Sequence, residues 1–445
     1  MSAGGKTRTL RSYLLLPRPK DAVKWWILPT TFAMGVLSNG GATTQQVWRF
    51  VVVWAALELL VYQARYQWND IRGFVADQQH PDCHARGRLP GPLDRARRHV
   101  SASWLVALTR LSAVAAVPLL LPALHVGGAL AALTGAVFAI AIVYETLRAI
   151  GTGRTDRVPP PVRPAILGLW IVVGAGYAVR GVAGLALAID VTARPLLAAA
   201  SIVTLWAFGV AFVTGRWTLE ALAFAEVDGP RVVWRARVEQ AREHSLALTR
   251  WLPAHVPVDG SPNGGRWRAA DWPALRGRTA ALAPWNIAAV VTGTCAAATG
   301  RLLAAPAGGA GTLIAAGCGG LVTMAVLAAP RHRGPAVLLG AAVIAGVLAA
   351  VGSPCPLLAT LPWIGVLGAH IFFTSQSLST FGHPLRDALT RLGGSRGARQ
   401  LPRAGTRPGG RAAQRTGPGQ TTPARWPYAR GPCVTTQSGP ETRDR

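Results

Sequence analysis

Ten apolar runs make up nearly half of this 445-residue sequence, and each is close to the length that a helix needs to cross a membrane. A membrane-spanning helix requires about 20 predominantly apolar residues. Since backbone groups in a bilayer must satisfy one another, such runs predict helices. The sequence predicts an all-α, polytopic bundle of nine to ten transmembrane helices, because the short run 335–352 is also compatible with a broken or re-entrant helix. The runs lie at 25–40, 47–67, 101–122, 126–148, 164–188, 195–215, 280–301, 308–329, 335–352 and 357–376.

The composition favours a membrane protein over a soluble one. Hydrophobic residues make up 50% of the chain and charged residues 15%, and the mean hydropathy is +0.29. The formal net charge of +27 comes almost entirely from arginines that lie between the apolar runs and in the tail. This distribution is typical of cytoplasmic loops that contact anionic lipid headgroups, so membrane lipids are expected partners. We expect no nucleic-acid partner, because no aromatic-studded basic face or known binding module is present. The oligomeric state stays open.

The distribution of basic residues predicts the orientation of the chain and its division into regions. Loops 66–100, 149–163, 216–279 and 330–334 hold nearly all loop Lys and Arg, which is typical of the cytoplasmic side. We therefore expect a multi-pass protein of the cell membrane with both termini in the cytoplasm. The predicted regions are a basic cytoplasmic segment 1–24, a transmembrane helical domain 25–385 and a tail 386–445. The tail is rich in Arg, Gly and Pro, which predicts disorder.

Loop 216–279, within the transmembrane domain, is long and rich in arginine. Its stretch WRARVEQAREH, residues 234–244, has a helical pattern. We expect this stretch to lie as a helix on the membrane surface.

The richest polar chemistry follows the second run, in the stretch YQWNDIRGFVADQQHPDCHARGRLPGP at 66–92. If the preceding helix continues, Asp70 and Asp77 are two turns apart on one face, with Asn69 beside the first. Two carboxylates and an amide suit Mg²⁺, which is usually held through one or two carboxylates and substrate phosphates. The alternative is a solvated polar helix end, but ionisable clusters at membrane depth are functional by default. Basic residues able to meet the remaining phosphate charge are Arg72, Arg86 and Arg88.

Two further polar groups lie on the fourth and fifth runs. The fourth run ends in AIAIVYETLR, where Tyr144 and Arg148 are one turn apart with Glu145 between them. This pair fits either phosphate binding or the snorkelling of interfacial side chains. Arg180 lies inside the otherwise apolar fifth run, within GAGYAVRGVAG. Because a buried arginine is costly, it must face a carboxylate or a phosphate in the bundle interior.

A fourth group follows the sixth run. If that helix continues, Arg216 and Glu220 form a pair four residues apart. Asp228 lies eight residues beyond Glu220 and is a candidate metal ligand. The string Asp228-Gly229-Pro230 is equally typical of a turn.

These motifs resemble those of the UbiA superfamily of intramembrane prenyltransferases, whose first signature is N-D-x-x-D-x-x-x-D. Asn69, Asp70 and Asp77 match it, and Gly73 stands where the middle Asp belongs. The pair Tyr144 and Arg148 resembles the Tyr-x-x-x-Lys that ends the fourth helix of the family. The family's second acidic motif, D-x-x-x-D, is lacking after the sixth run. The branch that includes decaprenyl-phosphate phosphoribosyltransferase is the most similar one in three features. These are the order of residues that begins at Asn69, the arginine in the fifth run, and the string at 214–220.

The resemblance implies a UbiA-like bundle that transfers a prenyl group from a prenyl diphosphate, or another lipid-linked substrate, to an aromatic or lipid acceptor. Mg²⁺ would assist the departure of diphosphate. Alternatives are phosphoribosyl transfer to a polyprenyl phosphate, terpene cyclisation on the same fold, and a non-catalytic membrane paralogue. The implied roles are: catalytic, Asp70, Asp77, Tyr144 and Arg148; diphosphate-binding, Asn69, Arg72, Arg86, Arg88, Arg180 and Arg216; metal-binding, Asn69, Asp70, Asp77, Glu220 and Asp228.

The alternation of basic loops predicts which loops a membrane-impermeant reagent reaches. Single cysteines introduced near positions 40, 125 and 305 should be labelled in intact cells, because those loops lack arginine. Cysteines near 90, 155 and 250 should react only after the cells are opened. Labelling of the second set in intact cells would reverse the predicted orientation.

Overall fold

The computed structural model describes residues 9–17, 21, 24–236, 238–256, 266–305, 308–329 and 332–380. The predicted tail 386–445 lies outside the described residues, as does much of the basic segment 1–24. Within that segment the described part contains the short helix α1, Leu10–Leu15, whose Tyr13 is buried.

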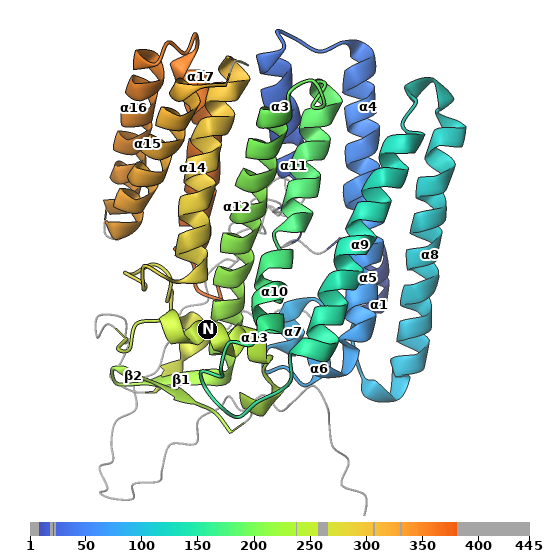
Figure 1. Ribbon diagram of the computed structural model, residues 1–445. Helices are drawn as coiled ribbons and strands as arrows, with labels where there is room; N and C mark the ends of the chain where they lie inside the picture. The colour runs from blue at the N-terminus through green and yellow to red at the C-terminus, as the bar shows by residue number, and fades with distance from the viewer. Residues whose placement is uncertain are drawn as a thin grey trace, which may run out of the picture.

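All ten apolar runs form helices, and the helices stand side by side (Figure 1). In the described part of the chain, nine helices are long and apolar enough to cross a membrane, which confirms the prediction of a polytopic helical protein. The first run forms α3, Ile27–Ser38, which at 12 residues is shorter than the rest. The run at 335–352 is one continuous helix, α16.

Several of the nine long helices are built from consecutive segments. Thr44–Arg72 comprises α4 (Thr44–Ala55), a π-helical turn (Ala56–Val61) and α5 (Tyr62–Arg72). Pro164–Ala188 comprises α10 (Pro164–Val172) and α11 (Ala175–Ala188). The others contain α8 (Ala96–Leu120), α9 (Gly127–Gly151), α12 (Pro195–Ala221), α14 (Pro284–Ala304), α15 (Ala310–Ala328), α16 (Arg333–Ala350) and α17 (Pro356–Thr374).

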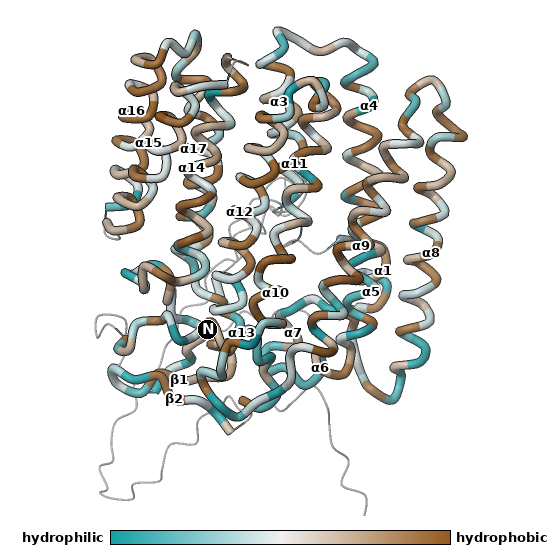
Figure 2. Tube along the Cα trace, viewed as in Figure 1, coloured by the Kyte–Doolittle hydropathy of each residue, from teal (hydrophilic) through white to brown (hydrophobic). Residues whose placement is uncertain are grey.

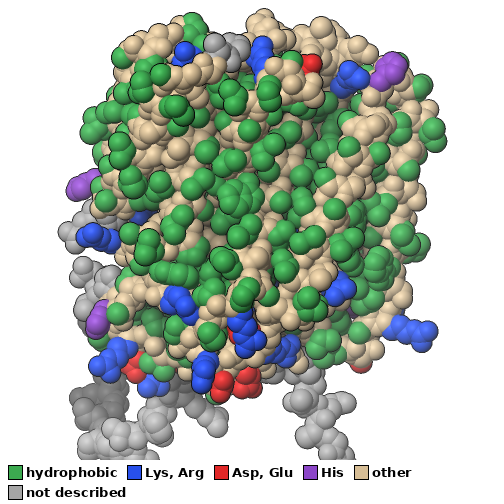
Figure 3. All heavy atoms as spheres, in the orientation of Figure 1, with side chains coloured by type: hydrophobic (Ala, Val, Ile, Leu, Met, Phe, Trp, Pro, Cys, Tyr) green, Lys and Arg blue, Asp and Glu red, His purple; other side chains and the backbone are tan. Residues whose placement is uncertain are grey.

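Apolar side chains cover the outside of the bundle, and basic side chains gather at one end. Large exposed apolar residues are frequent on the outer helices, for example Leu105 on α8, Leu313 on α15 and Leu338 on α16. The helices are brown along their middle and the loops at one end are mostly teal in Figure 2. In Figure 3 more Lys and Arg side chains lie near that lower end than along the middle of the bundle. We call this the basic end of the bundle; an apolar belt of this kind suits contact with membrane lipid.

Glycines allow α14 to pack closely against its neighbours α12, α15 and α17. A Cβ atom on Gly300 would lie 1.7 Å from the backbone oxygen of Ala359 on α17, and one on Gly293 would lie 1.9 Å from Oγ1 of Thr323 on α15. Small residues at such crossings let helix backbones approach, which replaces the hydrophobic driving force that is missing between helices in lipid. The buried Trp363 adds a hydrogen bond from Nε1 to the same Thr323 hydroxyl, at 2.9 Å.

The described part of residues 225–283 forms a cap over the basic end, and this cap contains a small sheet that the all-α prediction omits. Its strands are β1 (Ala225–Asp228), β2 (Arg231–Trp234) and β3 (Trp267–Arg268), antiparallel in the order β2-β1-β3. Apolar residues of the cap, among them Val227 and Trp272, pack with Trp170 of α10 and Trp285 of α14 in one buried cluster. The cap is therefore joined to the ends of the membrane helices.

The prediction of a surface helix over WRARVEQAREH is wrong. Trp234 ends β2, residues Val238–Gln240 form a single 3-10 turn, and the four-residue helix α13 begins at Glu243. The reason is that RVVW alternates along a strand, so that Val232 and Trp234 pack on the cap cluster while the backbone pairs with β1. Tertiary packing overrides the helical propensity of the charged residues that follow.

The close crossing of α14 and α17 predicts a steep cost for one added methyl group. Gly300→Ala should lower the free energy of unfolding by about 1–3 kcal/mol, since a Cβ atom meets backbone that cannot rotate away. Gly317→Ala on α15 is the control, because a Cβ there meets nothing within 4 Å. Melting temperatures of the purified variants in detergent provide the measurement, and equal values for both would contradict this packing.

Candidate functional site

The predicted acidic motif lies where the second long helix ends and turns, at the basic end. The helix α5 ends at Arg72, and α6 (Phe74–Gln78) follows directly after Gly73. Backbone hydrogen bonds from Gly73 to Asn69, 3.0 Å, and from Asp77 to Gly73, 2.9 Å, carry the helical path across this break. Asp70 and Asp77 are both buried. A Cβ atom on Gly73 would lie 3.2 Å from Oδ2 of Asp77, so the position of the family's middle Asp faces this carboxylate.

The loop after α6 brings two arginines back onto these carboxylates. Gly87 has a φ of 62° and ends the short helix α7 (Cys83–Arg86), a left-handed conformation that glycine adopts without strain. Beyond it, Leu89 is buried and its carbonyl accepts a hydrogen bond from the Gln78 side chain at 2.9 Å. These anchors hold Arg86 and Arg88 against the motif.

Arg88 contacts both carboxylates at once. Its Nη1 donates to Oδ1 of Asp70 at 2.5 Å, and its Nε lies 3.8 Å from Oδ2 of Asp77. Burial by itself lowers the pKa of Arg88, but the attraction of Asp70 and then Asp77 outweighs it and raises that pKa well above its ordinary value. The Arg88 guanidinium is thus a permanent cation between the two acids.

The same network extends to the end of α12. Arg86 lies 3.1 Å from Oδ1 of Asp77 through Nη1 and 3.7 Å from Oε2 of Glu220 through Nη2. Arg216 lies 3.4 Å from Oε1 of Glu220, the spacing expected for residues four apart on a helix. Residues about 140 positions apart in the chain therefore share one set of ion pairs.

The end of α9 contributes a second group of polar contacts, which adjoins the first through the chain neighbours Asn69 and Asp70. Arg148 donates through Nη1 to Oδ1 of Asn69 at 3.1 Å and through Nη2 to Oε2 of Glu145 at 2.5 Å. Arg72 donates to the same Glu145 oxygen at 3.1 Å. The Arg148 guanidinium also lies 5.7 Å from the centre of the Tyr144 ring, within cation–π range.

Ten residues thus form what we call the charged network. Five of them are arginines and four are carboxylates, which leaves one positive charge in excess when all are ionised. All but one of the ten are residues to which the sequence assigned a role; the exception is Glu145, which the sequence placed only beside Tyr144 and Arg148. The members are Asn69, Asp70, Arg72, Asp77, Arg86, Arg88, Glu145, Arg148, Arg216 and Glu220.

Two predicted site residues, Asp228 and Arg180, form ion pairs outside the charged network. Asp228 ends β1 at the turn before β2 and pairs with Arg266 at 2.9 Å on the surface of the cap. Gly229 has a φ of 56° there, so the turn alternative describes this string. Arg180 forms a bidentate pair with Glu58, at 2.6 and 3.2 Å, inside the bundle. Its required partner is therefore a carboxylate.

Glu58 is the residue that the sequence reasoning missed. It lies in the π-helical turn Ala56–Val61 and is 1% exposed. Its charge is paired with that of Arg180, whose guanidinium carbon lies 3.3 Å from the centre of the Tyr62 ring. Such turns are frequent at functional positions of helices. The signal was available in the sequence, because a single Glu in the second run and a single Arg in the fifth are each costly without the other.

Asp70 and Asp77 are the two carboxylates of the charged network that a metal ion in the predicted motif would need. Asp70 and Asp77 are close enough to share one guanidinium, so their oxygens converge on a single cation. Among the described residues no group of three or more His, Cys, Asp or Glu side chains is arranged to hold a metal. A Mg²⁺ ion bound here would therefore take its remaining ligands from Asn69, water and substrate phosphate, the arrangement that Mg²⁺ commonly adopts.

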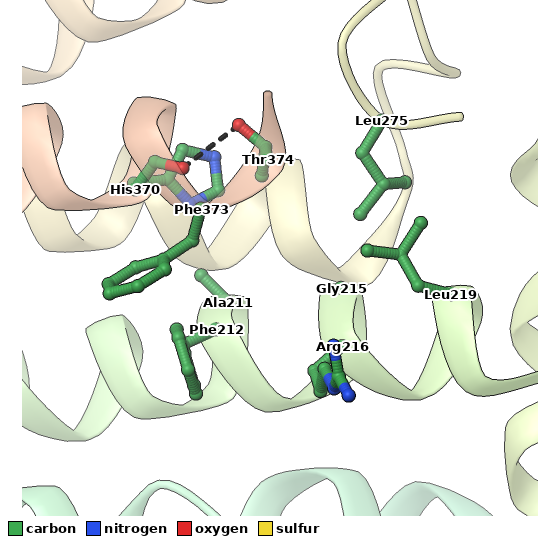
Figure 4. A pocket seen from close by; sticks show the side chains of 9 residues that line it. All are labelled: Ala211, Phe212, Gly215, Arg216, Leu219, Leu275, His370, Phe373 and Thr374. Atoms are coloured by element: carbon green, nitrogen blue, oxygen red, sulfur yellow. Dashed lines mark hydrogen bonds between the residues drawn. The ribbon is translucent and has the colours of Figure 1, made fainter. Parts of the chain in front are cut away.

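An apolar pocket adjoins the network at Arg216. It is a narrow cavity of about 10 Å³, room for about one water molecule, between α12 and α17, and its lining combines Phe212, Leu219, His370 and Phe373 with Arg216. Figure 4 shows the rings of Phe212 and Phe373 toward one side of this pocket and Arg216 toward the other. Apolar side chains of α12, α14 and α17 fill the seam that follows, which shares Ala211 and His370 with this pocket.

Comparison with known proteins adds no relative. No protein-family model, curated protein or solved structure matches the chain. The resemblance to the UbiA superfamily accordingly rests on the motifs quoted above, and the function is a proposal.

The buried Glu58–Arg180 pair predicts a large effect of removing one partner. Glu58→Leu should lower the free energy of unfolding by about 3–5 kcal/mol, because Arg180 is left as an uncompensated charge in the bundle. The double variant Glu58→Leu/Arg180→Met should recover most of that loss. Asp228→Asn, at an exposed pair, should change stability by less than about 1 kcal/mol. Thermal unfolding in detergent tests this, and a harmless Glu58→Leu would refute it.

Proposed function

We propose that the protein is an intramembrane transferase of UbiA type, which moves a prenyl group from a prenyl diphosphate to an aromatic or lipid acceptor. The observation that carries this proposal is that Asp70, Arg148 and Arg216 from three membrane helices, and Asp77 from the adjoining α6, meet in the charged network at the basic end. In this proposal the basic end faces the cytoplasm, where the positively charged loops belong.

The network supplies what a diphosphate leaving group requires. A phosphate group is recognised best by planar guanidinium donors, and the network presents five of them with one charge in excess of its carboxylates. Asp70 and Asp77 would hold a Mg²⁺ ion, which would supply positive charge against the departing diphosphate. The arginines that now pair with these acids, Arg86 and Arg88, are then free to donate to phosphate oxygens. Arg148, oriented by Glu145 and Asn69, donates from the opposite side.

The apolar pocket supports a chain-bearing substrate. Arg216 borders both the network and the pocket, so a diphosphate held by Arg216 would direct its attached chain toward Phe212, Phe373 and His370, whose side chains would have to move apart to admit it. Aromatic faces next to the reacting carbon stabilise a developing cation. The bundle interior also keeps water away from that carbon.

The role of the two acids is tested by removing their charge. Asp70→Asn and Asp77→Asn should each lower turnover by a factor on the order of 10² to 10³, since a metal ligand is lost and the leaving-group charge is uncompensated. Asp94→Asn is the matched control, because Asp94 is an exposed acid at the same end of the bundle. Membranes containing each variant are assayed with labelled prenyl diphosphates, with and without Mg²⁺.

Two results would contradict the proposal. One is unchanged activity in both variants, and the other is a loss of folded protein that is proportional to the loss of activity. A parallel assay with labelled phosphoribosyl diphosphate and a polyprenyl phosphate distinguishes prenyl transfer from the alternative, phosphoribosyl transfer. A product formed only in that assay would replace prenyl transfer by phosphoribosyl transfer.

A further inference from the structure

The segment Arg242–His244 of the cap lies against the end of α9 and the charged network. Arg242 and Arg154 form an isolated backbone bridge, and the Glu243 carboxylate accepts a hydrogen bond from the backbone of Gly153 at 2.9 Å. The His244 ring meets Trp217 of α12 edge to face, with ring centres 4.6 Å apart. Trp217 in turn lies 6.3 Å, ring to ring, from Tyr144 at the network. This part of the cap therefore packs beside the ends of α9 and α12, next to residues of the network.

Arg242 is a cation that makes no ion pair within the described part of the chain. Its side chain is half-buried. Burial lowers the pKa of Arg242, and the neighbouring guanidiniums of Arg148 and Arg154 lower it further; the weaker opposing influence of Tyr144 and Asp77 does not offset them. Its sequence neighbour Glu243 is already engaged with Gly153 and with Arg163 at 3.5 Å.

His244 offers a second unsatisfied group beside Arg242. The residue is 3% exposed, and its Nδ1 atom has no hydrogen-bond partner within the described part of the chain. Burial, followed by the charges of Arg242 and Arg148, lowers the pKa of His244 to about 3, so its imidazole is neutral at physiological pH. A neutral imidazole still donates one N–H, and anionic phosphate oxygen is a suitable acceptor. Buried polar atoms without partners are rare enough to need an explanation.

We propose that Arg242, together with Arg154 and His244, forms a phosphate subsite on the cap side of the charged network. Its ligand is the terminal phosphate of the diphosphate-bearing substrate. This inference rests on the proposed function, because it places the second phosphate of the same diphosphate. The network itself is almost neutral, whereas a diphosphate carries several negative charges. The unpaired guanidiniums of the cap supply the missing positive charge, at the end where the leaving group separates from the chain.

The subsite is tested by binding of inorganic diphosphate to the purified full-length protein. Arg242→Gln should weaken binding about tenfold or more, because a charge-assisted hydrogen bond to phosphate is lost. Arg242→Lys should recover part of the affinity, since it keeps the charge and loses the planar fork. Arg231→Gln is the matched control, being an exposed cap arginine on β2 with no partner in the described residues. Isothermal titration calorimetry gives the affinities.

The outcomes separate the subsite from the proposed function. Failure of the parent protein to bind diphosphate would contradict the proposed function, whereas equal affinities for the parent, Arg242→Gln and Arg231→Gln would overturn the subsite alone. Should Arg242→Gln fail to fold, Arg154→Gln at its exposed neighbour gives the same comparison. Repeating the titration in nanodiscs of phosphatidylcholine, with and without phosphatidylglycerol, identifies the source of the phosphate. Abolition of diphosphate binding by phosphatidylglycerol would assign the subsite to a lipid headgroup and overturn the proposal.

Discussion

The pairing of buried carboxylates with arginines is the constraint on which the basic half of this bundle depends. An isolated charge in a low-dielectric interior costs several kcal/mol, so each buried acid needs a partner held in good geometry. Asp70 is paired with Arg88, and Glu58 deeper in the bundle is paired with Arg180. Each pair links segments that are distant in the sequence. The ion pairs therefore fix how the helices and the loop after α6 are arranged, beyond what apolar packing between helices in lipid specifies.

This pairing also sets the conditions for binding a metal. The two acids of the motif are paired with Arg86 and Arg88, so the proposed Mg²⁺ would have to displace guanidiniums whose charge cannot be titrated away. Displacement is favourable only if the released arginines find a new anion. A diphosphate supplies that anion and brings further oxygen ligands for the metal. Metal and diphosphate are therefore expected to bind together, and Gly73, beside Asp77, leaves one carboxylate fewer to favour the metal by itself.

The sequence predicted the helices and most of the residues that meet in the site, because apolar length and local spacing are read directly from the chain. Arg216 and Glu220, four residues apart, are one example. Contacts between residues far apart in the sequence were harder to predict. Glu58 and Arg180 are 122 residues apart, and no local sequence pattern identifies them as partners. The small sheet was missed because Arg231–Trp234 is stabilised as a strand by pairing with β1 and by packing on the cap cluster. Asp228 was left open between a metal role and a turn.

The division between bundle and cap follows from where charge can be left uncompensated. On the membrane side of the site, acids and arginines nearly balance, since an excess charge beside apolar helices is costly. On the cap side, water and counter-ions screen a surplus, so Arg154 and Arg242 can lie near Arg148 without ion pairs of their own in the described part of the chain. An anion that enters from the basic end therefore meets a positive potential at the cap first. It then reaches the paired arginines of the bundle, whose partners it must displace.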